Sequence, residues 1–287
     1  MLQKGGDPML TSVVIPVRDT VDQLLYTLFS FNLQFIGFEK FEVIVLDNAS
    51  RDGVTEKIAG FAAHYPLQCL RFRRTLPLAE LLNRGMKQAR GELIIFLSPT
   101  MIVPREFISV HLHAYEKNPR LVLLGLNTRR IYSVYDPLFS PIQHAECREW
   151  LENYPYIKRP HSQTQTIRLL EEGQIVNGQA YPISLPCPET EKRLTIWQKY
   201  GASLSGYRWP WTLFSTRHVS VSRASLEAAG VFKVLPRVEM ERDLAKRLMK
   251  KGAVFQLDEK LTLLGQEWVR RKVLDRPPLS KKNRRAY

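Results

Sequence analysis

The sequence predicts an α/β fold with a Rossmann-like, mostly parallel sheet that is covered by helices on both faces. Short apolar, β-rich runs alternate with amphipathic helical stretches from residue 11 to residue 126. The connections are short, which favours right-handed crossovers between parallel strands. With 287 residues, of which 44% are hydrophobic, the chain is long enough for one large core. An irregular segment rich in Pro and aromatic residues, 132–211, is expected to pack against this sheet as a partly helical insertion.

The elements follow in a regular order. Thr20 and Gln23 have the spacing of a capping box that opens the first helix, Gly91 is predicted to end the third, and Pro104 to start the fourth. We expect strands over 11–17, 41–46, 68–72, 93–97, 120–126, 218–222 and 253–257. We expect helices after Thr20, over 52–63, 78–89, 104–115, 223–229 and 238–250.

Composition limits the partners of the chain. The formal net charge of +14 favours anionic partners, namely nucleotide phosphates, acidic lipids, anionic glycans or nucleic acid. Much of this charge lies in a basic tail, 269–287, which is either solvated or docks on a membrane surface or polyanion. No signal peptide, spanning segment or Cys/His ligand spacing is evident, so we expect a cytoplasmic protein, at most peripheral to the membrane, without zinc or disulfides. No nucleic-acid-binding motif accompanies the charge, and specific nucleic-acid binding is not expected.

Polar residues follow the first two strands. Pro16-Val17-Arg18-Asp19 ends one strand, and Asp47-Asn48-Ala49-Ser50 ends the next. Ligands of parallel sheets bind outside the carboxyl ends of the strands, where side chains bind a base or ribose and amides bind phosphate. Such residues also serve as ordinary turns and caps, so both interpretations remain open from the loops alone.

The order of several segments resembles the glycosyltransferase family 2 catalytic domain, which has the GT-A fold. The segments are 12–19, 41–50, 82–85 and 89–97, with a weaker return around 214–248. The resemblance implies a nucleotide-sugar site, with a UDP-sugar as the expected donor. The residues implied to border the nucleotide are Pro16, Val17, Asp19, Asp47, Asn48 and Asn83, with Asp47 reading the uracil or ribose.

One part of the family pattern is missing. The family places an Asp-x-Asp after the fourth strand, where two carboxylates hold a divalent cation; this chain has Ser98-Pro99-Thr100. Two hydroxyls do not replace two carboxylates, so no metal site is predicted and metal dependence is doubtful. A cationic side chain must then neutralise the diphosphate. The candidates are Arg71, Arg73, Arg74, Arg217 and His218, of which Arg217 and His218, with Ser98 and Thr100, stand at the diphosphate or degenerate metal position.

The resemblance also implies a catalytic base at the start of a late helix. Glu241 is the first candidate and Asp243 the second. The alternative is structural, since a first-turn carboxylate stabilises the helix dipole and Asp243 has the spacing to pair with Arg247. Trp209 and Trp211 are candidates for stacking on an acceptor sugar, or for core or lid packing.

These observations predict a family 2-like glycosyltransferase that transfers a sugar from a nucleoside diphosphate sugar to a glycan, lipid or protein acceptor, with inversion and with little or no metal dependence. Polysaccharide biosynthesis is the expected context. The alternative is a catalytically inactive member that keeps nucleotide or glycan binding and serves as a scaffold. We expect a nucleotide-sugar-binding half, 10–130, an acceptor-side half, 131–268, and the basic tail.

Overall fold

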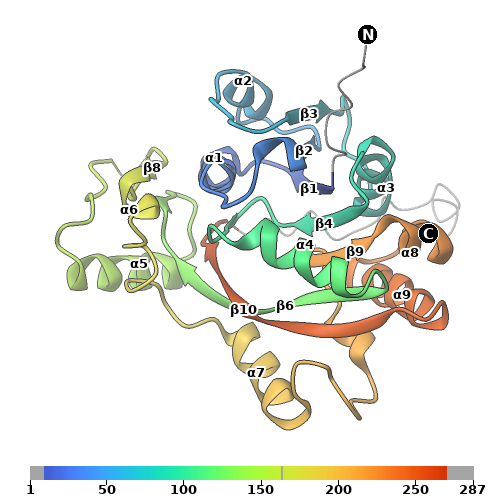
Figure 1. Ribbon diagram of the computed structural model, residues 1–287. Helices are drawn as coiled ribbons and strands as arrows, with labels where there is room; N and C mark the ends of the chain where they lie inside the picture. Colours follow the sequence, from blue (N-terminus) through green and yellow to red (C-terminus); the bar gives the residue numbers. More distant parts are fainter. Residues whose placement is uncertain (1–9, 163, 270–287) are drawn as a thin grey trace, which may run out of the picture.

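A mixed sheet forms the centre of the protein (Figure 1). The computed structural model describes residues 10–162 and 164–269. Within them the sheet has eight strands in the order β3-β2-β1-β4-β9-β6-β10-β5. The strands are β1 (Thr11–Val17), β2 (Phe41–Asp47), β3 (Leu67–Arg71), β4 (Leu93–Leu97), β5 (Met101–Ile102), β6 (Leu121–Ile131), β9 (His218–Ser222) and β10 (Val254–Gln266). The pairs β1–β2, β2–β3, β1–β4 and β6–β10 are parallel, whereas β9 and β5 pair antiparallel with their neighbours. The predicted mostly parallel α/β sheet is confirmed.

Helices cover both faces of the sheet (Figure 1). Side chains alternate between the faces along each strand, so Val13 and Ile15 of β1 join one core while Val14 joins the other. The first core includes side chains of α1 (Val21–Phe31), α2 (Val54–Ala59) and α4 (Phe107–Lys117). The second includes those of α3 (Leu78–Gln88), α8 (Arg223–Ala229) and α9 (Arg237–Lys250).

The segment predicted to be irregular contains more regular structure than expected. It holds β7 (Val134–Tyr135), α5 (Pro141–Asn153), β8 (Ile167–Arg168), α6 (Glu172–Val176), α7 (Pro188–Tyr200) and the 3-10 helix η2 (Pro210–Leu213); another 3-10 helix, η1 (Phe38–Lys40), precedes β2. Tyr132, Trp150 and Ile183 belong to a third core beneath this insertion. The indole N–H of Trp150 donates to the Ile183 carbonyl at 2.7 Å, which satisfies its one buried donor.

Several local predictions were wrong. Thr20 is the N-cap of α1 but makes no side-chain capping bond; the Val21 amide donates instead to Asp52 Oδ2 at 2.8 Å, from the neighbouring loop. The helix predicted over 52–63 is only α2, and the strands predicted over 120–126 and 253–257 extend much further, as β6 and β10. Gly91 does not end α3, which stops at Gln88; a Cβ at Gly91 would lie 2.6 Å from the Ser12 amide nitrogen, so the glycine permits close backbone packing.

Candidate functional site

A cavity of about 630 Å³ lies where the parallel strands end. Pro16 and Val17 at the end of β1, Asn48 after β2 and Ser98 after β4 contribute to its wall. The ends of β6 and β10 complete that edge, with Arg130 and Gln266 in the lining. The predicted position of a ligand site, beyond the carboxyl ends of the strands, is therefore where the structure has its cavity.

Asn48 fixes the loop that forms one side of this cavity. Its side-chain amide donates to the Leu76 carbonyl at 3.0 Å, and its side-chain oxygen accepts from the Leu76 amide at 2.8 Å. Leu76, Pro77 and Leu78 line the cavity, as do Pro16 and Val17. The two reciprocal hydrogen bonds fix Leu76 and so the apolar wall that it begins. An apolar wall of this kind suits the flat face of an aromatic ring.

Asp47 does not line the cavity. Its side chain is fully buried, and Oδ1 accepts from the Ser50 amide at 2.9 Å while Oδ2 accepts from Thr55 Oγ1 at 3.3 Å. Arg71 Nε lies 3.8 Å from Oδ2. These contacts make Asp47 the organiser of the loop after β2; its contact with a nucleotide stays a prediction.

Two other residues that were predicted to border the nucleotide also hydrogen-bond to backbone groups. Asp19 Oδ1 accepts from the Arg51 amide at 2.8 Å, which joins the loops after β1 and β2. Asn83 on α3 donates to the Phe232 carbonyl and accepts from the Phe232 amide, both at 2.9 Å. Neither residue belongs to the cavity lining; they hold the segments around it.

The residues in the Asp-x-Asp position do not fit a divalent cation. Ser98 and Thr100 line the cavity, and their hydroxyls hydrogen-bond to each other at 3.1 Å. The cavity carboxylates, Glu189 and Glu267, are paired with Arg217 and Arg130. Among residues 10–162 and 164–269, no group of three Asp, Glu, His or Cys side chains is arranged to hold a metal ion, whereas Mg²⁺ and Mn²⁺ prefer carboxylate and other hard oxygen ligands.

His218 lies in the cavity wall and is neutral near pH 7. Its Nε2 is 2.9 Å from His111 Nε2, and His111 Nδ1 is 2.8 Å from Ser220 Oγ. Burial lowers the pKa of His218 well below 6.5 and that of His111 to about 3. Without a positive charge, His218 is unsuited to neutralising a diphosphate.

Arginines supply the positive charge of the cavity instead. Five lie in the lining: Arg18, Arg130, Arg193, Arg217 and Arg237. Four of them have a carboxylate within 4.0 Å, in Asp19, Glu267, Glu189 and Glu241 respectively. Arg193 has no such partner among the described residues. Its guanidinium donates to the Gly125 carbonyl and, at 2.9 Å, to the Leu213 carbonyl, which fixes its charge in place; burial lowers the pKa of Arg193.

The helix that carries Arg193 is tied to the sheet. Thr190 Oγ1 accepts from the Thr128 amide at 2.9 Å and donates to the Thr128 carbonyl at 2.8 Å. Pro188 provides a preset first turn for α7. Arg193 lies one turn after Thr190, so these bonds hold its side chain at the cavity.

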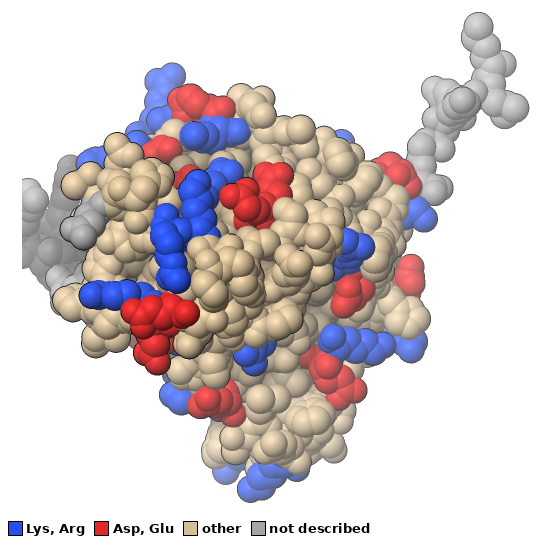
Figure 2. Space-filling view, turned by 90° about the vertical axis from the view of Figure 1, so that its left-hand side faces the viewer, with Lys and Arg blue, Asp and Glu red and all other residues tan. Residues whose placement is uncertain are grey.

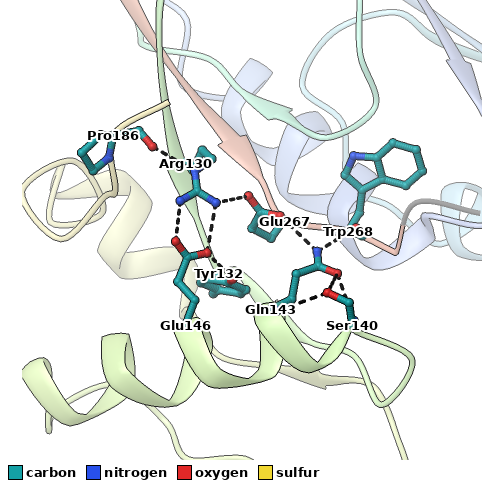
Figure 3. Close-up of polar contacts among 8 residues, drawn as sticks. All are labelled: Arg130, Tyr132, Ser140, Gln143, Glu146, Pro186, Glu267 and Trp268. Carbon is teal, nitrogen blue, oxygen red and sulfur yellow. Dashed lines mark hydrogen bonds and ion pairs between the residues drawn. The ribbon is translucent and has the colours of Figure 1, made fainter. Parts of the chain in front are cut away.

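A polar network joins α5 to the part of the cavity wall that Arg130 and Glu267 form (Figure 3). Arg130 donates to both oxygens of Glu146, at 2.6 and 3.0 Å, and to Glu267 Oε1 at 2.9 Å. The Tyr132 hydroxyl donates to Glu146 at 2.6 Å, and Gln143 Nε2 to Glu267 Oε2 at 3.2 Å. Hydrogen bonding to Glu146 in particular raises the pKa of Arg130 above its ordinary value. The network fixes two cavity residues, Arg130 of β6 and Glu267, which directly follows β10.

Glu241 lies behind this cavity in the first turns of α9. Its Oε1 accepts from the Thr216 amide at 2.9 Å, the Thr216 hydroxyl at 2.6 Å and Arg237 Nε at 3.1 Å. Oε2 has no hydrogen bond with any described residue. Thr216 and Arg237 line the cavity, and Glu241 itself does not.

Asp243 and the two tryptophans lie outside the cavity lining. Asp243 pairs with Lys233 at 3.1 Å and with Arg247 at 2.8 Å, which is the structural alternative raised for this residue. Trp211 is half-buried against the second core, and Trp209 is 49% exposed. The structure therefore brings together Pro16, Val17, Asn48, Ser98, Thr100, Arg217 and His218, with Glu241 behind them.

Sequence patterns did not identify Arg130, Arg193, Arg237, Glu189 or Glu267 as cavity residues. Arg193 and Glu189 lie on a helix within the segment predicted to be irregular. Glu267 directly follows β10, which ends at the same edge of the sheet as β1 and β2, but the strand predicted in this part of the chain stopped at residue 257.

Outside the cavity, the face shown in Figure 2 is not uniformly basic. Lys and Arg side chains lie beside Asp and Glu side chains, separated by wide areas of other residues. Mixed charge of this kind does not form the continuous basic stripe of a nucleic-acid surface. The basic tail of the sequence prediction, from residue 270 onward, lies outside the described residues.

This combination of a GT-A sheet and a strand-end cavity defines a nucleotide-sugar-type glycosyltransferase fold. Residues 12–174 match the family described as Glycosyl transferase family 2. Uncharacterized glycosyltransferase YfnE of Bacillus subtilis (strain 168) is 32% identical over 265 residues, covering 90% of this chain and 65% of YfnE. Dolichol-phosphate mannosyltransferase of Pyrococcus furiosus is 27% identical over 119 residues, covering 41% of this chain and 33% of that protein. The chain belongs to glycosyl transferase family 2, as its sequence predicted.

Solved structures agree on the fold. S. aureus TarS in complex with UDP-GlcNAc has a TM-score of 0.59 at 13% identity, covering 91% of this chain and 59% of that chain. Mannosyltransferase PcManGT from Pyrobaculum calidifontis, in complex with GDP-Man and Mn²⁺, has a TM-score of 0.56 at 15% identity, covering 91% and 57%. This chain thus spans about three fifths of these two solved chains, of which the TarS chain is residues 1–349, and 37% of the longer TarS chain; it spans 65% of YfnE. Within the described residues, no helix is both long and apolar enough to cross a bilayer.

Proposed function

We propose that this protein transfers a sugar from a nucleoside diphosphate sugar, with UDP-sugars as the first donors to test, and that arginine neutralises the leaving diphosphate in place of a divalent cation. The observation that carries the proposal is Arg193, a cavity arginine without a carboxylate partner among the described residues, in a site whose Asp-x-Asp position reads Ser98-Pro99-Thr100. A planar guanidinium held on two carbonyls retains N–H donors for phosphate oxygens.

The donor nucleotide fits the part of the cavity between Pro16, Val17 and the wall that Asn48 holds. The diphosphate then points toward Arg193, Arg217 and Arg237. Arg217 is paired with the exposed carboxylate of Glu189, an ion pair that costs little to exchange for a phosphate. The binding of UDP-GlcNAc by TarS and of GDP-Man by PcManGT supports a donor of this class.

For the chemical step we propose inversion with Glu241 as base. The acceptor hydroxyl attacks the anomeric carbon, the bond from that carbon to the diphosphate oxygen breaks, and Glu241 takes the hydroxyl proton while the nucleoside diphosphate leaves with the bond electrons. Glu241 Oε1 already accepts three hydrogen bonds, so Oε2 is the oxygen for the proton. Both oxygens of Asp243 are paired, which favours Glu241. A glycan or lipid-linked molecule is the proposed acceptor.

Calorimetric titration with UDP, UDP-sugars and GDP-mannose tests donor binding. Arg193→Met is expected to weaken the binding of a cognate donor by about 10- to 100-fold, the loss typical of a hydrogen bond to a charged group. Lys192→Met removes an exposed charge from the same helix and is expected to bind as the wild type does. Equal affinity in Mn²⁺ and in EDTA is expected; binding that requires Mn²⁺ contradicts the role of Arg193.

Product formation tests the base. Glu241→Gln is expected to keep donor binding and lose donor hydrolysis or transfer, while Asp243→Asn keeps both. A wild-type chain that binds nucleotide sugar without turning it over would be the scaffold protein that the sequence left as an alternative. A chain that binds no nucleotide would contradict the whole proposal.

A further inference from the structure

The segment that leads into α9 exposes apolar side chains that no described element covers. Ten large hydrophobic side chains are exposed among the described residues, and four of them lie within residues 231–238. They are Val231 (56% exposed), Val234 (49%), Leu235 (39%) and Val238 (56%). Four of ten in eight consecutive residues form a cluster, unlike the single exposed apolar residues of ordinary surfaces.

The exposure follows from how this segment is anchored. Phe232 is 2% exposed and packs edge-on against Phe96, with ring centroids 5.3 Å apart. Asn83 holds both the amide and the carbonyl of Phe232. With Phe232 fixed inward, Val231 and Lys233 on either side of it face outward, and the chain reaches α9 with Val234 and Leu235 still in solvent.

The net charge around these side chains is positive, which favours an anionic partner. Residues 231–251 contain seven Lys or Arg and three Asp or Glu. Val238, Arg242 and Lys246 follow one another at four-residue spacing on α9, and all three are exposed. The other local pair of exposed apolar residues, Leu138 and Ile142, lies in residues 136–153, which contain one Lys or Arg and four Asp or Glu.

We propose that residues 231–246 form a docking surface for an anionic phospholipid bilayer. Val231, Val234, Leu235 and Val238 enter the interfacial region, while Arg242 and Lys246 contact lipid phosphates; Lys233 stays paired with Asp243. Apolar insertion combined with basic residues is what binds a surface element to anionic lipid. The acidic surroundings of Leu138 and Ile142 would be repelled by the same surface.

Docking here has a consequence for the cavity. Arg237, which lines the cavity, immediately precedes Val238 in the chain. The bilayer surface would therefore lie within one helical turn of the cavity wall, close to a lipid-linked molecule. The docking surface does not depend on the proposed sugar transfer, and vesicle binding is measured without a sugar donor.

Vesicle co-sedimentation of the full chain tests the proposal. We expect binding to equimolar phosphatidylglycerol and phosphatidylcholine and none to phosphatidylcholine alone. The double variant Val234→Ser/Leu235→Ser is expected to lose most of this binding, and Arg242→Gln or Lys246→Gln to weaken it about fivefold each. The matched control Leu138→Ser/Ile142→Ser removes two exposed apolar residues elsewhere and is expected to bind as the wild type does.

Three outcomes overturn the proposal. The first is a wild-type chain that does not bind anionic vesicles. The second is unchanged binding of the Val234→Ser/Leu235→Ser variant, which would assign the affinity to another part of the chain. The third is a dimer in sedimentation equilibrium that the same double variant dissociates, which would make a second copy the partner. Unfolding midpoints and donor titration in solution, both expected to be unchanged, separate loss of docking from loss of fold or donor binding.

Discussion

Asp258 is a buried carboxylate in β10 with a hydrogen bond on one oxygen. Its side chain is 3% exposed, Oδ1 accepts from the Lys260 amide at 3.0 Å, and Oδ2 is buried without a partner among the described residues. Burial raises its pKa to about 6 from 3.8. Because the folded state holds the proton more tightly than the unfolded state, this group lowers stability as the pH rises from about 4 to about 6. A pKa shift of about two units corresponds to roughly 3 kcal/mol in the free energy of unfolding.

We therefore expect Asp258→Asn to raise the free energy of unfolding at pH 8 and to leave it nearly unchanged at pH 4. Urea denaturation at both pH values measures this. Glu227→Gln, at an exposed position of α8, is the control and is expected to change neither. Equal stabilisation by Asp258→Asn at both pH values would show that its effect is packing and not ionisation.

The ring of His218 leaves no space for a side chain at Gly125. A Cβ at this position would lie 2.0 Å from His218 Nδ1, and His111 fixes the other nitrogen of that ring. We expect Gly125→Ala to destabilise the protein by roughly 1–3 kcal/mol through overpacking and to weaken donor binding, since Gly125 and His218 both line the cavity. Gly173→Ala, where nothing lies within 4 Å of the added Cβ, should be neutral in thermal denaturation; a similar loss there would contradict the steric explanation.

The sequence predicted one side of the cavity and missed the other for a physical reason. Pro16, Asn48 and Ser98 follow buried strands that must be neighbours in a parallel sheet, so local pattern implies their proximity. Arg193 and Glu267 meet them through the packing of α7 and the end of β10. No spacing in the sequence records those contacts. The sequence did not show that Asp47 organises its own loop, since a strand-end carboxylate that binds a ligand and one that holds a loop have the same local sequence.

At the scale of elements, α5 is held against the cavity wall by charge as well as by apolar packing. Glu146 accepts two bonds from Arg130 and one from Tyr132, and Figure 3 shows Gln143 of the same helix reaching Glu267. Removal of Glu146 leaves Arg130 with Glu267 as its carboxylate partner among the described residues. The position of α5 and the orientation of Glu267 are therefore coupled.

We expect Glu146→Ala to lower the free energy of unfolding by roughly 2 kcal/mol, the scale of a partly buried charged hydrogen bond, and to reduce the affinity for donor or acceptor. The exposed Glu149→Ala on the same helix is the control. A double-mutant cycle of Glu146→Ala with Tyr132→Phe isolates the coupling, and an additive result would contradict a connected network.

The lengths of elements were less predictable than their order. β6 and β10 extend well beyond their apolar runs, to Ile131 and Gln266, because they pair with each other through ten residue pairs interrupted by a bulge between Asp258 and Thr262. Polar residues such as Asn127 and Thr262 join this pairing and hydrogen-bond to each other at 2.8 Å. Tertiary pairing thus extends strands over residues that local β-propensity leaves out.

At the scale of the whole molecule, the buried histidines set the response to acid. His111 and His218 stay neutral in the folded state but take up protons near pH 6.5 when unfolded, so their contribution to stability is full above about pH 6.5 and falls as the pH decreases. Asp258 changes stability in the opposite direction between about pH 6 and pH 4. Each group changes the free energy of unfolding by about 1.4 kcal/mol per pH unit. Two histidines therefore change it more than one carboxylate does.

The wild-type chain is therefore expected to lose stability between pH 7 and pH 5, and Asp258→Asn to lose it more steeply because the opposing group is gone. Urea unfolding midpoints at half-unit pH intervals measure both slopes. His64, which is exposed, provides the control: His64→Gln should follow the wild-type slope. If the slope of Asp258→Asn were instead shallower than that of the wild type, acid sensitivity would come from ionised carboxylates and not from the buried His111–His218 pair.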